Sequence, residues 1–339
     1  MLLGLSGRPV PAVRAAERGG SSPGQQVHAY GVDVGLVRLS VTARTMKGDL
    51  VHDLTPQEFE VLEEGLRQEV VRFGHHEAPI SVVVLFDKSA SMRDEKLMHA
   101  KDGAVNFVRA LRAQDEVLVV AFSEGVDVLG AFGLDRRMLE RATKSIRAES
   151  GTRLYDAVLE GARAIASPGR KEKRALLILS DGEDTASAAT LEEAVQGARR
   201  AGVPFYAIGI EMDEEDPGRR GGAPGGRSGL GDGSRLGFDP LWRGLDPPAV
   251  RKPRTGPSEA IGTLTRLTEG TGGWTYPIVA ARRCKEVCLR VAEELRDQYL
   301  LGYLPSHGAR DGGWRTVVVR TSRPGVTLTT RAGYYATSP

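Results

Sequence analysis

Apolar runs alternate with amphipathic stretches through the middle of the chain, and this pattern predicts its fold. Ile80 and residues 82–86 are apolar without polar alternation, as expected for a strand buried on both faces of a parallel sheet. Helical periodicity separates this strand from those that follow, so the order indicates βαβ units in a doubly wound, mostly parallel α/β sheet. Further strands are expected at residues 115–122, 126–132, 174–179, 204–210 and 274–276, and helices at 94–112, 136–146, 153–166, 191–201, 258–268 and 281–297.

The two ends of the chain have a different pattern, typical of antiparallel strands. Residues 30–79 show approximate two-fold alternation, one helical turn after Thr55, and a strand–turn–strand signature around Glu64-Gly65. Residues 298–339 again predict strands separated by glycine-containing turns. Because each segment is too small to be stable alone, we expect the two to pair as one small β domain, with the α/β domain of residues 80–297 inserted between them.

Two segments lack any hydrophobic period. Residues 1–29 are rich in Gly, Pro, Ser and Arg and are predicted to be a disordered or processed leader, although the initial MLLGL is too short for a clear signal-peptide core. Residues 211–257 are also rich in Gly, Pro and Arg and carry an acidic cluster, which we interpret as a solvated charge run within a flexible insertion.

The composition indicates a soluble globular protein and narrows the classes of partner. With 40% hydrophobic residues, 27% charged residues and a net charge of +2, the 339-residue chain shows no pull toward nucleic acid. No apolar run approaches the ~20 residues that span a bilayer. The two cysteines, Cys284 and Cys288, exclude a disulfide scaffold, and we expect half-buried thiols on one helix face.

Three loops are expected to meet at the carboxyl edge of the sheet, where ligands bind in open α/β folds. They present two carboxylates and three hydroxyls, and neither an imidazole nor a thiolate. Such a set suits a small hard cation, Mg²⁺ with Mn²⁺ or Ca²⁺ as alternatives, and without it the carboxylates would repel each other. The predicted site residues are Asp87, Ser89, Ser91, Thr152 and Asp181.

The motif D-x-S-x-S, followed by a distant Thr and a distant Asp, resembles the von Willebrand factor A (VWA) domain and its metal-ion-dependent adhesion site (MIDAS). DKSAS, GTRLYDA and LILSDGED carry the resemblance here. It implies a Rossmann-like domain over residues 80–297 in which the three hydroxyls ligate Mg²⁺ directly and the two carboxylates act mainly through water. The flanking β segments resemble those of bacterial VWFA-related proteins, many of them exported, which implies an extracytoplasmic location.

These features together predict a non-enzymatic, Mg²⁺-dependent adhesion or interaction module. A cation held by few formal charges stays electrophilic and can accept an Asp or Glu carboxylate from a protein partner as a further ligand. One alternative is a structural scaffold whose metal only stiffens the loops, and another is that the hydroxyls merely cap helices.

An enzymatic alternative is a metal-dependent phosphohydrolase of the haloacid dehalogenase type, which also has a hydrophobic strand that ends in an acid. It needs a second acid where this chain has Ser89, and a serine cannot shuttle a proton near neutral pH. A serine hydrolase is less compatible still, because the G-x-S-x-G elbow is missing. Lys88, which could mimic a catalytic lysine, is expected to be a solvated loop residue.

Overall fold

The computed structural model describes residues 35–75, 78–211, 258–306, 308 and 311–336. The predicted leader at residues 1–29 and, apart from Glu211, the predicted insertion at 211–257 lie outside these residues. The described parts belong to one compact unit, Gly35–Pro339. Among the described residues, no helix is both long and apolar enough to cross a membrane.

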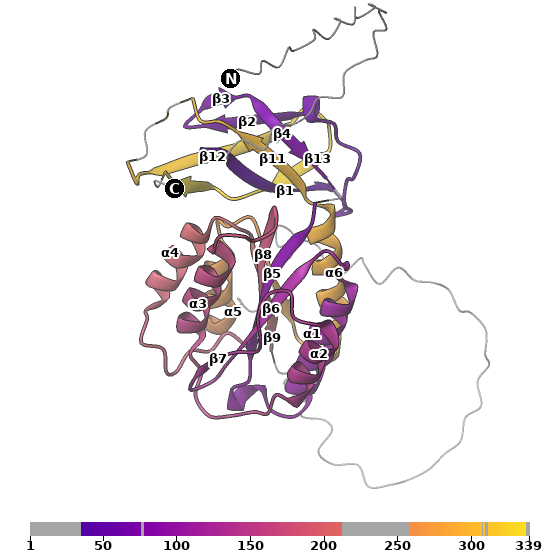
Figure 1. The fold of residues 1–339 in the computed structure, drawn as a ribbon, viewed down its shortest axis with the longest axis vertical. Coiled ribbons are helices and arrows are strands. Elements are labelled where there is room, and N and C mark those ends of the chain that lie inside the picture. The colour runs from indigo at the N-terminus through magenta and orange to yellow at the C-terminus, as the bar shows by residue number, and fades with distance from the viewer. Residues whose placement is uncertain (1–34, 76–77, 212–257, 307, 309–310, 337–339) are drawn as a thin grey trace, which may run out of the picture. The chain divides into compact units, whose positions relative to one another are not determined.

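A six-stranded sheet forms the centre of the α/β part, in the order β10-β9-β8-β5-β6-β7 (Figure 1). All pairs are parallel except β6 with β7. β5 lies in the middle with every residue buried, as its unbroken apolar run predicts. The strands are β5 (Ile80–Asp87), β6 (Glu116–Phe122), β7 (Val126–Val128), β8 (Lys173–Ser180), β9 (Phe205–Ile210) and β10 (Thr275–Ile278).

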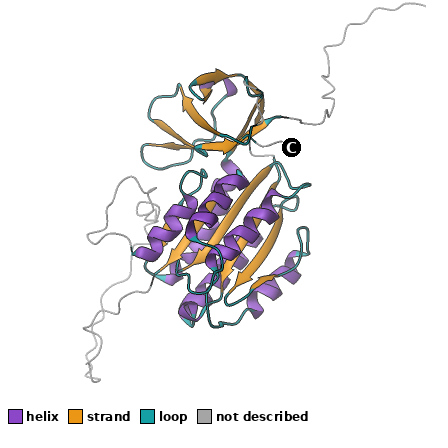
Figure 2. Ribbon diagram, turned by 90° about the vertical axis from the view of Figure 1, so that its left-hand side faces the viewer, coloured by secondary structure: helices purple, strands orange, loops and turns teal. Residues whose placement is uncertain are grey.

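Helices cover both faces of this sheet (Figures 1 and 2). Alternate residues of β5 supply the hydrophobic cores on the two faces. Val82, Val84 and Phe86 pack with α1, α2 and α6, whereas Val83 and Leu85 pack with α3, α4 and α5. The predicted doubly wound α/β fold is therefore confirmed. The helices are α1 (Glu95–Ala110), α2 (Arg136–Ser145), α3 (Leu154–Ala166), α4 (Leu191–Ala201), α5 (Glu259–Thr268) and α6 (Cys284–Asp297), the last preceded by η5 (Ala281–Arg283).

The two cysteines lie where α6 crosses α1. Both are fully buried free thiols, so the expectation of half-buried thiols was wrong. The crossing is close because Gly103 of α1 has no side chain: a Cβ there would lie 2.8 Å from the Cys284 Sγ and 3.0 Å from the Cys288 Sγ. The tight helix packing excludes solvent from both sulfurs.

The two ends of the chain combine in two four-stranded sheets, ordered β13-β1-β11-β4 and β14-β12-β2-β3. In each, strands from before β5 pair antiparallel with strands from after α6. The predicted insertion of the α/β fold into a β domain is thus observed. The elements are β1 (Val37–Thr45), η1 (Pro56–Glu58), β2 (Phe59–Glu63), β3 (Leu66–Gln68), β4 (Val70–Gly74), β11 (Tyr299–Tyr303), β12 (Trp314–Thr321), β13 (Val326–Thr329) and β14 (Gly333–Tyr335).

The second arm of the predicted early hairpin does not stay in one sheet. β3 pairs with β2 across the Glu64-Gly65 turn, but after Glu69 the chain continues as β4, which pairs with β11 of the other sheet. Glu64 and Gly65 both adopt positive φ, 49° and 79°, as a tight turn requires. The break at Glu69 lets a single segment contribute to both sheets.

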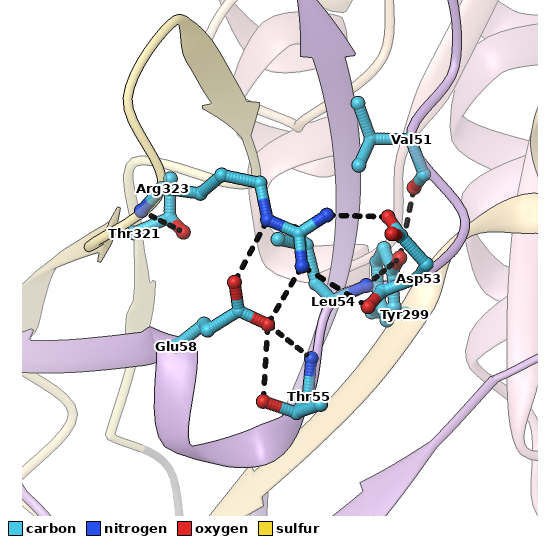
Figure 3. Close-up of polar contacts among 8 residues, drawn as sticks. All are labelled: Val51, Asp53, Leu54, Thr55, Glu58, Tyr299, Thr321 and Arg323. Carbon is cyan, nitrogen blue, oxygen red and sulfur yellow. Dashed lines mark hydrogen bonds and ion pairs between the residues drawn. The ribbon is translucent and has the colours of Figure 1, made fainter.

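A polar network joins the loop before β2 to the C-terminal strands (Figure 3). Arg323 donates from Nε and Nη2 to the two carboxylate oxygens of Glu58, at 2.8 and 2.9 Å, and also pairs with Asp53. Tyr299 of β11 donates its hydroxyl to the Val51 carbonyl at 2.8 Å. These contacts fix the loop against residues that lie more than 200 positions later in the sequence.

A second network is buried where β1 meets α6. The carboxylate of Glu294, fully buried, lies 2.6 Å from the Arg44 guanidinium. It also accepts hydrogen bonds from the hydroxyls of Thr42 at 3.2 Å and of Tyr206 and Tyr276, each at 2.9 Å. The charge of this acid is therefore matched by a cation and by three neutral donors, which makes its burial tolerable.

Candidate metal centre

Asp87 is the last residue of β5, and its carboxylate is fully buried at the carboxyl edge of the sheet. One oxygen, Oδ1, accepts a hydrogen bond from the Ser89 backbone N–H at 2.8 Å. The other, Oδ2, accepts from the Ser180 hydroxyl at 2.6 Å. Ser180 ends the neighbouring strand β8 and also accepts from the Gly182 N–H at 2.9 Å, so it links the loops that follow β5 and β8.

Ser180 is a site residue that the sequence reasoning missed. Its signal lay in the strand register: Phe86 of β5 pairs with Leu179 of β8, so the next residues along the two parallel strands are Asp87 and Ser180. This register places the Ser180 hydroxyl beside Asp87, whereas aligning the two strands by their acids would have paired Asp87 with Asp181.

Burial and the charge of Asp181 both act on the Asp87 carboxyl. Burial raises the pKa of Asp87 to about 6, and the charge of Asp181 adds to that rise, while hydrogen bonds from Ser180 and Ser89 oppose it. A bound cation would offset both the burial of the charge and the repulsion between the acids.

Ser89 and Ser91 follow Asp87 in a short 3-10 helix region, η2 (Ala90–Met92). Their hydroxyl oxygens lie 3.0 Å apart; Ser89 is buried, whereas Ser91 is exposed. The Ser89 side chain makes no capping hydrogen bond to η2, and the N-cap of α1 is Asp94. Helix capping therefore does not account for these two hydroxyls.

Thr152 is buried and is joined to the loop that carries Asp181. Its N–H donates to the Thr185 hydroxyl at 3.0 Å, and its carbonyl accepts from the N–H groups of Thr185 and Ala186 at 2.9 and 3.0 Å. These contacts run through the Thr152 backbone and bring the second and third predicted loops together. Gly151 precedes it with a φ of 72°, and a Cβ there would lie 3.2 Å from the Glu124 Cα.

Asp181 has a cationic neighbour that the sequence did not indicate. Its Oδ2 lies 3.1 Å from the Nζ of Lys96, in the first turn of α1, and its Oδ1 accepts from the Glu183 N–H at 3.4 Å. The Lys96 and Asp181 side chains are 10% and 7% exposed, so this ion pair is largely shielded from water.

The expectation that Lys88 is solvated was wrong. Lys88 is buried because its ammonium pairs with Asp127 at 2.8 Å and with Glu149 at 2.5 Å, and Glu149 also accepts from the Ser123 hydroxyl at 2.7 Å. The Glu149 N–H donates to the Lys88 carbonyl at 2.8 Å. Lys88 therefore holds the segment that leads to Thr152 against the loop of Asp87.

Within the described ranges, no three His, Cys, Asp or Glu side chains form a metal-binding cluster. A cation at this edge of the sheet would therefore need hydroxyl oxygens in addition to Asp87 and Asp181. The predicted donor set is composed of oxygen alone, two acids and the hydroxyls of two serines and a threonine, and such donors fit a hard cation such as Mg²⁺.

Residues 81–221 match the von Willebrand factor type A domain. The match begins in β5 and runs past β9, so it includes all three loops of the candidate site. The predicted resemblance to the VWA domain is confirmed at this level, and the α/β fold described above is the VWA fold. A search of curated proteins finds no significant match.

Solved structures with similar folds come from several organisms. A von Willebrand factor type A protein from Catenulispora acidiphila is 13% identical, covering 90% of this chain and 76% of that chain, with a TM-score of 0.47. BatB from Bacteroides thetaiotaomicron is 18% identical, with 64% and 98% covered and a TM-score of 0.43. Proximal thread matrix protein 1 from the mussel byssus, with a zinc-occupied MIDAS motif, is 14% identical, with 65% and 48% covered and a TM-score of 0.45.

Proposed function

We propose that this chain is a non-enzymatic, Mg²⁺-dependent protein-interaction module whose VWA domain captures an acidic side chain of a partner protein. The observation that carries the proposal is the pair of buried acids, Asp87 and Asp181, together with the exposed residue Ser91, whose hydroxyl oxygen lies 3.0 Å from that of Ser89. The buried acids supply negative charge for a cation, and the exposed Ser91 marks the side from which a partner would approach.

Five residues would hold the cation, with Mn²⁺ or Ca²⁺ as alternatives to Mg²⁺. By resemblance to the MIDAS, the hydroxyls of Ser89, Ser91 and Thr152 act directly and the carboxylates of Asp87 and Asp181 act mainly through water. A bound Mg²⁺ supplies an electrophilic centre for a carboxylate oxygen. The chain's own contribution is the fixed arrangement of the loops, through Ser180 and through the Thr152 backbone.

The proposal includes the setting of the module. We keep the predicted division into a β domain from residues 30–79 and 298–339 and a VWA domain from residues 80–297. The resemblance of the β segments to those of exported bacterial proteins supports an extracytoplasmic location, where the partner would be another envelope or secreted protein.

A phosphohydrolase fits the site less well. In that chemistry the strand-end acid attacks phosphorus, yet both oxygens of Asp87 accept hydrogen bonds, from Ser89 N and Ser180 Oγ. Ser89 also occupies the position where an acid/base carboxyl would be needed. The structural scaffold with a purely stabilising metal is the alternative that an experiment must separate from adhesion.

Metal-dependent melting tests the site itself. At a tenfold excess of Mg²⁺ over its dissociation constant, mass action stabilises the folded protein by about 1.4 kcal/mol. EDTA and the substitution Asp181→Ala should each remove this increment. Glu183→Ala, which removes an exposed acid from the same loop, is the matched control and should keep it. If Mg²⁺ leaves the melting temperature of the wild type unchanged, metal binding by the wild-type protein is refuted.

Binding to an immobilised peptide separates adhesion from a scaffold. A glutamate-containing peptide should retain the protein in Mg²⁺ and release it in EDTA, while the matched glutamine peptide should not retain it. Asp181→Ala should lose this retention and Glu183→Ala should keep it. Metal-dependent melting without metal-dependent retention on acidic peptides or on envelope proteins would support the scaffold instead.

A further inference from the structure

Asp181, which the proposed function assigns to the metal site, already has a positively charged neighbour, Lys96. Lys96 places its Nζ 3.1 Å from Asp181 Oδ2, and the two side chains are 10% and 7% exposed. The MIDAS pattern of acids and hydroxyls contains no such lysine. The helix does not need a lysine there either, because an apolar residue could fill this buried position of α1.

We propose that Lys96 is a resident counter-cation, which neutralises Asp181 in the metal-free protein and lowers the affinity of the site for Mg²⁺. The inference rests on the proposed function, because it concerns the same metal site. It assigns to Lys96 the role of setting how tightly the cation is held.

The argument follows from charge and burial. Two acids, Asp87 and Asp181, and one ammonium give the site a single net negative charge, and a dication would turn this into a single net positive charge. Without Lys96 the filled site would be neutral. The ammonium therefore repels the incoming metal, and because the pair is buried, water and salt screen this repulsion only weakly.

The same charge has a consequence for the partner. A filled site with a net positive charge attracts a carboxylate more strongly than a neutral site does. In the metal-free site the net charge is negative and repels the carboxylate. Lys96 thus weakens the binding of the metal. It also increases the difference in carboxylate affinity between the metal-filled and the metal-free site, so that capture of an acidic partner depends more strongly on the metal.

Calorimetric titration with MgCl₂ tests the role of Lys96. Lys96→Met should bind Mg²⁺ at least about tenfold more tightly than the wild type, and its metal-free form should melt at a lower temperature because Asp181 loses its cation. Lys101→Met is the matched control: it removes a positive charge from the same helix, but Lys101 donates to the carbonyls of Lys144 and Ile146 and not to the site. Its Mg²⁺ affinity should equal that of the wild type.

The outcomes distinguish this inference from the proposed function. If the wild type binds Mg²⁺ and Lys96→Met binds it equally or more weakly, the inference is overturned and the proposed function stands. If neither binds Mg²⁺, both fail. If only Lys96→Met binds, Lys96 blocks the site, and the inference stands while the metal-dependent function of the wild type fails. If the methionine variant does not fold, Lys96→Gln replaces it, because it keeps a hydrogen-bond donor but removes the charge. It should likewise bind Mg²⁺ more tightly than the wild type.

Discussion

Glu294, where α6 meets β1, and Asp87, at the end of β5, are both fully buried acids, but their surroundings differ. Glu294 accepts from a guanidinium and from three hydroxyls. Among the described residues, Asp87 accepts from two neutral donors, Ser89 N and Ser180 Oγ, and faces the charge of Asp181. The first acid has its counter-charge within the fold, whereas the charge of the second is left for a ligand.

The pKa shifts of the titratable groups also differ between the two regions. Burial and the charge of Glu294 raise the pKa values of Tyr206 and Tyr276, so both phenols keep their protons and donate. At Asp87, burial raises the pKa of the acid itself, to about 6. In the first region the carboxylate lies beside a guanidinium, whereas in the second region burial penalises the ionised carboxylate in the absence of a cation.

The largest expected effect tests the Glu294 region. Glu294→Gln should lower the free energy of unfolding by about 3–5 kcal/mol, because it leaves the buried Arg44 guanidinium without its counter-charge. Chemical denaturation at neutral pH measures this. Glu293→Gln, the same change at an exposed position of α6, should cost almost nothing. Equal stability of the two variants would show that the network around Glu294 does not contribute to the fold.

Replacing the Asp87 carboxylate by an amide should have the opposite effect and raise the free energy of unfolding. The folded-state pKa of about 6 lies above the ordinary value of 3.8, so stability from the protonated acid is present at low pH and is lost as the pH rises through 6. In EDTA at neutral pH, Asp87→Asn should therefore stabilise the protein by about 1–3 kcal/mol. It should also abolish the stabilisation by Mg²⁺. A variant less stable than the wild type in EDTA would mean that the Asp87 carboxylate is structural.

The comparison of these regions also shows what the sequence could predict. The unbroken apolar run of β5 predicted a central strand, and the D-x-S-x-S motif predicted which oxygens follow it. Asp87, Ser89 and Ser91 are close in sequence, so a local motif suffices to place them together. The ligand roles of all five site residues stay predictions, as do the domain boundaries.

Lys88 and Lys96 show why the remainder was not predictable. Both are buried by acids that are distant in sequence: Lys88 by Asp127 and Glu149, and Lys96 by Asp181. Periodicity describes one element at a time, whereas these pairs depend on how loops from several strands meet. A lysine read from sequence alone is assigned to solvent, because burial without a partner is costly.

The break between β3 and β4 also depends on contacts between residues that are distant in sequence. The alternation of residues 66–74 predicts an extended chain, and the chain is extended on both sides of Glu69. The first half pairs with the adjacent β2 across the Glu64-Gly65 turn, whereas the second half joins β11, more than 200 residues later. The local pattern thus determines the strand conformation, and the partner strands determine where the segment changes sheets.

The smallest expected effect on stability concerns the partly exposed ion pair of Arg323 and Glu58. Comparing it with the buried pair at Glu294 separates the effect of burial from the effect of charge pairing. Hydrogen bonds from Arg323 lower the pKa of Glu58 to about 2, but both side chains are partly exposed, so water screens the pair (Figure 3). Arg323→Gln should lower the melting temperature at neutral pH by far less than Glu294→Gln does. The exposed Arg320 on β12 provides the control, because Arg320→Gln should have no effect.

The pH dependence of that small effect has a definite sign. Because the folded-state pKa of Glu58 lies below its ordinary value of 4.5, the pair contributes stability above pH 4.5 and loses it as the pH falls toward 2. The melting temperatures of the wild type and Arg323→Gln should therefore converge in acid. A difference that stays constant down to pH 2 would show that Arg323 acts through packing of its aliphatic stem and its contact with the Asp53 carbonyl. In that case, packing and not its charge pair with Glu58 would account for the contribution of Arg323 to stability.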